Sequence, residues 1–337
     1  MGLSAFIGAQ LAVGIPGIEV SNEVIAHLRR THAQSLVMFR RNIVSSEQFV
    51  RLIHQLEEAL ERRLLILIDH EGGRIMRFPE GVTHFPDAMT QGRVQDEKAA
   101  ERQGAIEAEE LRRLGVHVNL APCVDVIVEG ANPVIGDRSY GSDPLRVGTL
   151  AAARIRGLQS NGVGACAKHF PGLGAVPKDP HRVLPTIWLD WKTMERTHLP
   201  PFRAAIAAGV SSVMSSHVCY PMLGEPPEFP ATFSSRLIRR LLREQMEFPG
   251  VMMTDALEMG ALRAFGKIGE AAVRATEAGH DLLLICSEDL SQASEVFSAL
   301  KRAYEAGRLR RHQLEASLER LSRFRQQFLS QPLKDHA

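Results

Sequence analysis

The chain has 337 residues, of which 45% are hydrophobic and 23% are charged, so it has a globular composition and the length of one large domain or two ordinary ones. Its 40 lysines and arginines balance 39 aspartates and glutamates, which gives no electrostatic basis for binding nucleic acid or an anionic membrane. The four cysteines show no CxxC spacing, and no apolar run reaches membrane-spanning length. We therefore expect a cytoplasmic, monomeric protein without disulfides, nucleic-acid partners or membrane contact.

The N-terminal stretch MGLSAFIGAQLAVGIPG lacks the charged region of a signal peptide and ends in a turn, so it is interpreted as the first strand. Short runs rich in Val, Ile, Leu and Met recur after it. Continuous apolar runs of this kind are typical of parallel strands, because both faces of such strands are buried. The expected strands are residues 11–15, 35–39, 64–69, 116–126, 164–170, 211–217, 250–255 and 281–286.

Stretches with charged faces separate most of these runs, and glycines follow several of them as helix C-caps do. This alternation predicts a single (β/α)8 TIM-type barrel over residues 1–337, closed by an amphipathic helix at about 311–330. A doubly wound open sheet is the alternative, but no dinucleotide-type glycine fingerprint follows the first strand. The expected helices between strands are residues 46–62, 95–114, 144–160, 190–208, 234–245 and 268–279.

Polar residues follow the predicted strands, where a barrel of this type carries its chemistry. Each ends or follows an apolar run, so their side chains should meet at one rim. Asp255 could be a catalytic carboxylate or only the N-cap of the next helix. Lys168 could form a Schiff base, as in barrel aldolases, or donate hydrogen bonds to a polar ligand. The rim residues are Asp69, Asp125, Asp137, Arg138, Lys168, His169, His217 and Asp255.

The segment AKHFPGLGAVPKDPHRVLP carries an Asp-x-His pair on a loop poor in core-forming residues. Pro180 should keep Asp179 extended, and in extended chain Asp179 and His181 point to the same side. The carboxylate can then orient the imidazole for acid–base work, the alternative being two unrelated exposed groups. Gly172 and Gly174 should let this loop move as a lid. No metal is expected, because no HxH follows the first strand and the histidines are scattered.

Several long motifs, in order along most of the chain, resemble the bacterial β-N-acetylglucosaminidases of glycoside hydrolase family 3. KHFPGLGAVPKDPH is similar to the family's signature loop, with Pro180 where Ser or Thr is usual. IDHEGGRIMRFPEG resembles a second segment, in which His70 replaces a common Gln. The segments APCVDV, GDRSYGSDP, MSSHVCYP and MTDALEM match further family segments in order and spacing.

The resemblance implies a retaining glycosidase without a cofactor, acting on a carbohydrate such as a muropeptide or chito-oligosaccharide. It implies Asp255 as the nucleophile, His181 as the acid/base and Asp179 as its support. It also implies five contacts to the N-acetylglucosamine unit. A barrel aldolase using Lys168 and an inactive sugar-binding relative remain alternatives, and phosphorolysis in place of hydrolysis stays open. The implied sugar contacts are Asp69, Arg77, Arg138, Lys168 and His169.

Overall fold

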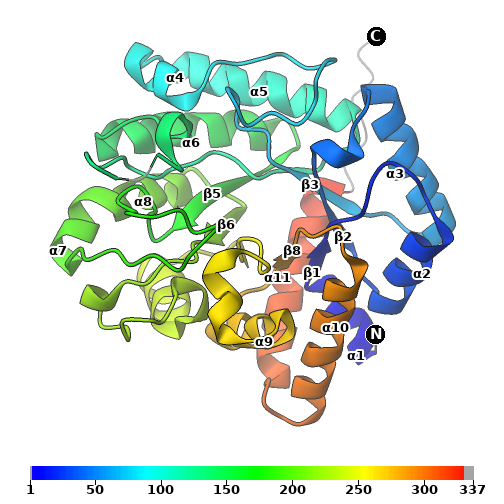
Figure 1. Cartoon of the computed structure of the whole chain (residues 1–337). Coiled ribbons are helices and arrows are strands. Elements are labelled where there is room, and N and C mark those ends of the chain that lie inside the picture. Colours follow the sequence, from blue (N-terminus) through cyan, green and yellow to red (C-terminus); the bar gives the residue numbers. More distant parts are fainter. Residues whose placement is uncertain (1, 132, 330–337) are drawn as a thin grey trace.

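The computed structural model describes residues 2–131 and 133–329 and has eight parallel strands surrounded by helices (Figure 1). The strands are ordered as in the chain, β8 lies beside β1, and a parallel bridge between Met253 and Leu282 joins β7 to β8. The predicted (β/α)8 barrel is confirmed. The strands are β1 (Leu11–Val13), β2 (Ser35–Met38), β3 (Leu65–Ile68), β4 (Val118–Asn119), β5 (Gly164–Phe170), β6 (Ser212–Ser215), β7 (Val251–Met253) and β8 (Leu283–Ile285).

Helices follow the strands and form the outer layer (Figure 1). Several begin with a side-chain cap, such as the Asp143 carboxylate that accepts the Leu145 N–H before α6. The main helices are α1 (Leu3–Ala9), α2 (Asn22–Thr31), α3 (Ser46–Leu60), α4 (Ala88–Val94), α5 (Glu97–Arg113), α6 (Pro144–Ser160), α7 (Trp191–Thr193), α8 (Leu199–Ala207), η6 (Arg236–Gln245), η7 (Gly260–Phe265), α9 (Ile268–Ala278), α10 (Leu290–Glu305) and α11 (Arg311–Leu329).

Two expectations about strands are wrong. The N-terminal stretch before Leu11 forms α1 and not strand, because Leu3 and Ile7, one helical turn apart, both pack into the core. β4 is also much shorter than the predicted 116–126. Pro122 has no N–H to donate to a ladder, so after Asn119 the chain continues as a loop. This loop stays beside β5 through a bridge from Cys123 and through isolated hydrogen bonds, such as the one from the Cys166 N–H to the Ala121 carbonyl at 2.8 Å.

The strands are apolar throughout because both faces are buried. Inward-facing side chains fill the barrel, and outward-facing ones pack against the helices. Leu321, Phe324 and Phe328 of α11 pack with these inward-facing side chains, so α11 covers the floor of the barrel. The predicted helix at about 311–330 corresponds to α11, and residue 330 lies outside the described residues. The inner residues of the strands, with Leu120 and Leu282 directly beside β4 and β8, are Ala12, Val37, Leu65, Leu67, Val118, Leu120, Cys166, Met214, Val251, Met253, Leu282 and Leu284.

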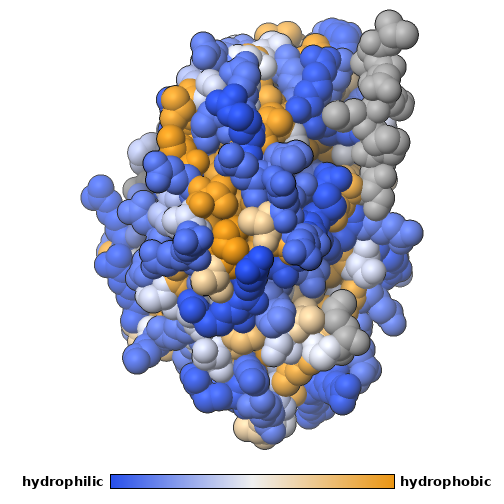
Figure 2. All heavy atoms as spheres, turned by 90° about the vertical axis from the view of Figure 1, so that its right-hand side faces the viewer, coloured by the Kyte–Doolittle hydropathy of each residue, from blue (hydrophilic) through white to orange (hydrophobic). Residues whose placement is uncertain are grey.

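The outer surface is mostly polar. Figure 2 shows the right-hand side of the view in Figure 1, where hydrophilic residues predominate and hydrophobic ones form narrow bands between them. Within residues 2–131 and 133–329, no helix combines the length and the hydropathy that crossing a bilayer requires.

Candidate active site

A cavity of about 660 Å³ lies at the carboxyl-terminal ends of the strands. Residues that follow most of the eight strands contribute to its wall, as expected for a barrel of this type. The cavity thus brings together the eight residues to which the sequence analysis gave a catalytic or sugar-binding role, whereas Asp125 and Asp137, also expected at the rim, do not line it. The eight residues are Asp69, Arg77, Arg138, Lys168, His169, Asp179, His181 and Asp255.

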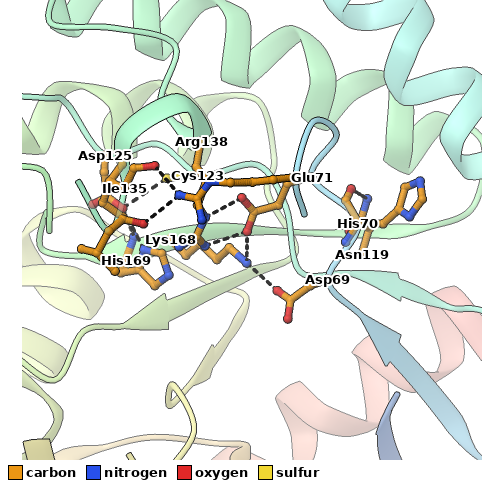
Figure 3. Close-up of polar contacts among 12 residues, drawn as sticks. Asp69, His70, Glu71, Asn119, Cys123, Asp125, Ile135, Arg138, Lys168 and His169 are labelled. Carbon is orange, nitrogen blue, oxygen red and sulfur yellow. Dashed lines mark hydrogen bonds and ion pairs between the residues drawn. The ribbon is translucent and has the colours of Figure 1, made fainter. Parts of the chain in front are cut away.

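Lys168 is the centre of a charged network on one wall (Figure 3). Its Nζ lies 2.6 Å from Asp69 Oδ1 and 2.7 Å from Glu71 Oε1, although β5 buries the side chain almost completely. Burial alone would lower the pKa of Lys168, but the charges of Asp69 and Glu71 raise it above its ordinary value. Arg77 holds the other carboxylate oxygen of Asp69 at 3.1 Å. An ammonium has three N–H donors, so Lys168 keeps one for a ligand.

Glu71 also anchors Arg138, which comes from the loop after β4 (Figure 3). The guanidinium makes two hydrogen bonds to the carboxylate, of 2.8 and 2.7 Å, a geometry that fixes both planes. Burial would raise the pKa of Glu71, but Arg138 and Lys168 bring it well below its ordinary value. Glu71 therefore holds two of the predicted sugar contacts, yet sequence reasoning did not select it.

A fully buried ion pair fixes the backbone beneath this network. Arg154 donates to the carbonyl oxygens of His70 and Glu71, at 3.0 and 2.7 Å, and pairs with Glu107 at 2.8 Å. His70 packs beside Phe78 and is not part of the cavity wall. This location agrees with the expectation that the unusual His70 does not touch the ligand.

His169 is oriented by Asp125, whose carboxylate is completely buried (Figure 3). The His169 Nδ1 lies 2.7 Å from Asp125 Oδ2, and the same carboxylate accepts the backbone N–H groups of His169 and Leu173. Burial would raise the pKa of Asp125, but His169 and these hydrogen bonds lower it. An ionised Asp125 holds the proton on Nδ1, which leaves Nε2 as the ring nitrogen available to a ligand.

Cys123, Asp125 and His169 are close enough together to be considered as metal ligands. Their ligand atoms are instead bonded to one another, since Asp125 Oδ2 lies 3.2 Å from Cys123 Sγ and 2.7 Å from His169 Nδ1. Burial and the Asp125 charge raise the pKa of the Cys123 thiol well above its ordinary value. Coordination needs the thiolate, so the three residues fit a hydrogen-bonded support for His169 better than a metal site.

The Asp179–His181 pair forms, but not in the predicted way. His181 Nδ1 lies 2.7 Å from Asp179 Oδ1, and the same oxygen accepts the His181 backbone N–H at 2.9 Å. The Asp179 carbonyl accepts the Arg182 N–H at 3.1 Å, so Pro180 occupies a turn and the expected extended chain is wrong. Slight burial would raise the pKa of Asp179, but the hydrogen bonds from His181 lower it.

The loop that carries this pair is packed at both ends. Of the two glycines expected to act as hinges, Gly174 lies so close to the backbone of Val126 that a Cβ would be 1.8 Å from the Val126 carbonyl oxygen. Tyr220 donates to the Gly172 carbonyl at 2.9 Å. Near the tip, the Gly260 N–H donates to the His181 carbonyl at 3.1 Å. These contacts argue against a hinge at the glycines, which instead permit close packing.

Asp255 lies two residues beyond β7, and its Oδ1 accepts the N–H of Ala256 at 2.8 Å. It is not an N-cap, because η7 begins only at Gly260 with Met259 before it. His217, after β6, lies with Nε2 2.9 Å from the Ala256 carbonyl and Nδ1 2.6 Å from Thr232 Oγ1. The backbone that carries Asp255 is thus fixed by a buried side chain.

Comparison with known proteins gives a consistent picture. The profile described as the glycosyl hydrolase family 3 N-terminal domain matches residues 7–324. A beta-hexosaminidase from Methylobacillus flagellatus is 33% identical over 307 residues, which are 89% of this chain and 86% of that protein.

Two solved structures illustrate the similarity in three dimensions. A glycoside hydrolase family 3 beta-N-acetylglucosaminidase from Paenibacillus sp. str. FPU-7 matches 98% of this chain with a TM-score of 0.94 and 38% identity, and the match spans 63% of that longer protein. Native NagZ from Neisseria gonorrhoeae matches 93% of this chain and 97% of its own with a TM-score of 0.77 and 30% identity.

Proposed function

Since the chain belongs to glycosyl hydrolase family 3, a family of glycosidases, we propose that it is a retaining β-N-acetylglucosaminidase that removes a terminal β-linked N-acetylglucosamine unit. One observation carries the proposal: a single cavity contains an acidic side chain after β7, an oriented Asp–His pair and a wall of fixed polar groups. The relatives named beta-hexosaminidase and beta-N-acetylglucosaminidase support this choice of sugar.

In the first step, the Asp255 carboxylate attacks the anomeric carbon while the bond from that carbon to the leaving oxygen breaks. His181 protonates the departing oxygen from Nε2, and Asp179 holds the opposite ring nitrogen. In the second step, His181 takes a proton from water, the resulting hydroxide attacks the same carbon, and Asp255 is released. Two inversions at one carbon give net retention of configuration.

The charged wall would bind the sugar before these steps. Lys168 and Arg138 are both held in place by Glu71, so each can direct a charge-assisted hydrogen bond at a hydroxyl or acetamido oxygen. Asp69 and Arg77 lie beside them, and His169 offers Nε2. The substrate we propose is a muropeptide or a chito-oligosaccharide, because both carry terminal β-linked N-acetylglucosamine.

The Schiff-base alternative for Lys168 is disfavoured by its surroundings. A nucleophilic lysine needs to lose its proton near neutral pH, which requires a lowered pKa. Burial is outweighed here by Asp69 and Glu71, and the pKa of Lys168 is raised. Lys168 is therefore a permanent cation that suits binding and not imine formation.

A panel of aryl glycosides tests the proposal. The protein should hydrolyse the N-acetyl-β-glucosaminide far faster than the β-glucoside or the β-xyloside, with retention of configuration by NMR. A 5-fluoro glycosyl fluoride should label the peptide that contains Asp255. Asp255→Asn should abolish turnover, whereas Asp137→Asn, a change at an exposed rim carboxylate paired with Arg74, should not. Label on a different acidic residue, or an inverted product, would contradict the mechanism.

A further inference from the structure

Glu258 is an acidic residue of the cavity wall that the mechanism above does not use. It lies three residues after Asp255, in the segment between β7 and η7, and lines the same cavity. Its Oε2 is buried and has no hydrogen-bond partner among the described residues. A buried polar atom without a partner is rare in folded proteins and needs an explanation.

The obvious cationic partner of Glu258 is engaged elsewhere. Arg41, after β2, donates to the carbonyl oxygens of Cys286 and Ile15 at 2.6 and 3.1 Å. Its guanidinium also lies over the Phe39 ring, 4.5 Å from the centroid. The charge of Arg41 therefore lowers the pKa of Glu258 to some extent, but the described residues show no ion pair between the two side chains.

The charges around Glu258 do not favour an ionised carboxylate. Burial raises the pKa of Glu258, and the nearby Asp255 raises it further. Backbone N–H groups of Glu258 and Cys286, together with the Arg41 charge, oppose this rise without cancelling it. The fold thus holds a desolvated carboxyl group next to the proposed nucleophile and gives one of its oxygens nothing to bind.

We infer that Glu258 is a substrate-binding residue whose free carboxyl oxygen hydrogen-bonds a ring hydroxyl of the sugar attacked by Asp255. A sugar hydroxyl can donate and accept, so it can satisfy Oε2 in either protonation state. The contact would come from the β7 side of the cavity, whereas Asp69, Lys168 and Arg138 lie on the β3–β5 side. The inference rests on the proposed function, because it assumes that a sugar occupies the cavity.

A binding role and a structural role make opposite predictions for stability. A residue kept for packing stabilises the fold, so its removal lowers the melting temperature. Glu258 instead has a raised pKa in the folded chain, so the carboxyl costs stability as the pH rises through that raised value. Glu258→Gln should therefore melt at the same temperature as the natural protein or higher at neutral pH, and its stability should depend less on pH.

The test is a double-mutant cycle between protein and substrate. The natural protein, Glu258→Ala and Glu258→Gln are assayed on nitrophenyl N-acetyl-β-glucosaminide and its 3-, 4- and 6-deoxy analogues. Loss of one hydrogen bond should lower kcat/KM on the full sugar about tenfold in Glu258→Ala relative to the natural protein. On the deoxy analogue that lacks the bound hydroxyl, the natural protein and Glu258→Ala should have nearly the same kcat/KM. Glu258→Gln, which keeps an acceptor and a donor, should retain most of the activity.

Glu288→Gln is the matched control, because Glu288 is an exposed glutamate after β8 that is not part of the cavity wall. Equal losses for Glu258→Ala on all four substrates, or an unchanged kcat/KM on the full sugar, would overturn the inference. So would a lower melting temperature of Glu258→Gln. If the natural protein itself does not turn over the N-acetyl substrate, the proposed function fails, and that outcome is visible before any variant is made.

Discussion

The imidazole Nε2 of His217 lies 2.9 Å from the carbonyl oxygen of Ala256, the residue whose N–H binds the carboxylate of Asp255. Burial lowers the pKa of His217, so the ring is neutral and donates its Nε2 proton to this carbonyl. The contact links β6 to the segment after β7. It makes the orientation of Asp255 depend on a side chain that has no chemical role in our mechanism.

His217→Ala should consequently lower kcat about tenfold and leave KM almost unchanged, because one buried hydrogen bond is lost and the carbonyl is left unsatisfied. His217→Gln, which can donate from the same region, should recover much of the rate. Steady-state kinetics on the aryl substrate measures both, with His54→Ala on the exposed face of α3 as the control. A Gln variant as slow as the Ala variant would mean that the ring does more than hold the backbone.

Glu71 should matter for stability as well as for binding. Glu71→Gln leaves Lys168 and Arg138 adjacent and without their shared counter-charge. Removing one partner from a buried ion pair destabilises a fold by about 3–5 kcal/mol. Urea unfolding should show a loss of this order, and kcat/KM should fall too. Glu129→Gln on an exposed loop is the control, and an unchanged unfolding midpoint for Glu71→Gln would contradict the assignment.

His181→Ala separates acid catalysis from positioning. A nitrophenolate leaving group hardly needs a proton, whereas a sugar alkoxide does. The variant should therefore lose far more activity on a natural disaccharide than in formation of the intermediate from a nitrophenyl glycoside. Burst kinetics and disaccharide turnover give the two rates. Losses of the same size on both substrates would assign His181 to shaping the cavity.

Asp179→Asn tests the partner of that histidine. The carboxylate lies 2.7 Å from His181 Nδ1 and has a lowered pKa, so it is ionised over the working range of pH. The amide removes the anion that stabilises the protonated ring. The alkaline limb of the kcat/KM profile should thus move to lower pH, because the acid form is lost earlier. If kcat/KM fell by the same factor at every pH, with no shift of the alkaline limb, Asp179 would act through the shape of the turn.

Buried histidines should make the fold sensitive to mild acid. The pKa of His70 and of His117 is lowered to about 3, and that of His27 and of His280 to about 4, chiefly by burial. Unfolded histidine titrates near 6.5, so the unfolded chain binds protons that the folded chain does not as the pH falls below this value. The free energy of unfolding is therefore highest above pH 6.5. As the pH falls from 6.5 toward the lowered pKa, it decreases by about 1.4 kcal/mol per pH unit for each such residue.

His70→Gln removes one of these four groups and also removes a ring nitrogen that lacks a partner. The slope of unfolding free energy against pH, between about pH 6 and 4, should then decrease by about 1.4 kcal/mol per pH unit, which corresponds to close to one bound proton. Urea titrations at several pH values measure this slope. The matched change at the exposed His54 should leave it as it is, and an unaltered slope for His70→Gln would show that His70 is protonated in the fold.

The sequence predicts the barrel well because its strands are apolar on both faces and its helices are not. It also predicts where Asp69, Lys168 and Asp255 lie, since each ends or follows an apolar run and the ends of parallel strands meet at one rim. Glu71 lies in one of the segments that carry the resemblance, but its importance comes from Arg138, 67 positions away in the chain. No local pattern carries that information.

Other features were beyond local reasoning for a similar reason. The turn at Asp179 depends on hydrogen bonds to its own side chain and carbonyl, which compete with the extended chain that a following proline favours. The tight packing of Gly174 depends on Val126, a residue of another loop. The sequence places His217 at the rim, but its contact with the Ala256 carbonyl, like the position of Glu258 in the cavity wall, depends on how β6, β7 and β8 lie side by side.

The position of α11 has a consequence for how the protein is made. Leu321, Phe324 and Phe328 complete an apolar layer whose other members come from the strands, beginning with Ala12 of β1. During synthesis from the N-terminus, all eight strands emerge before this helix does. The apolar residues at the bottom of the nascent barrel therefore stay exposed to water until residues near 328 leave the ribosome. Chaperones should therefore bind the nascent chain, and aggregation should begin, chiefly during this interval. When a ribosome is stalled before α11 is made, proteases should cut the exposed nascent chain readily.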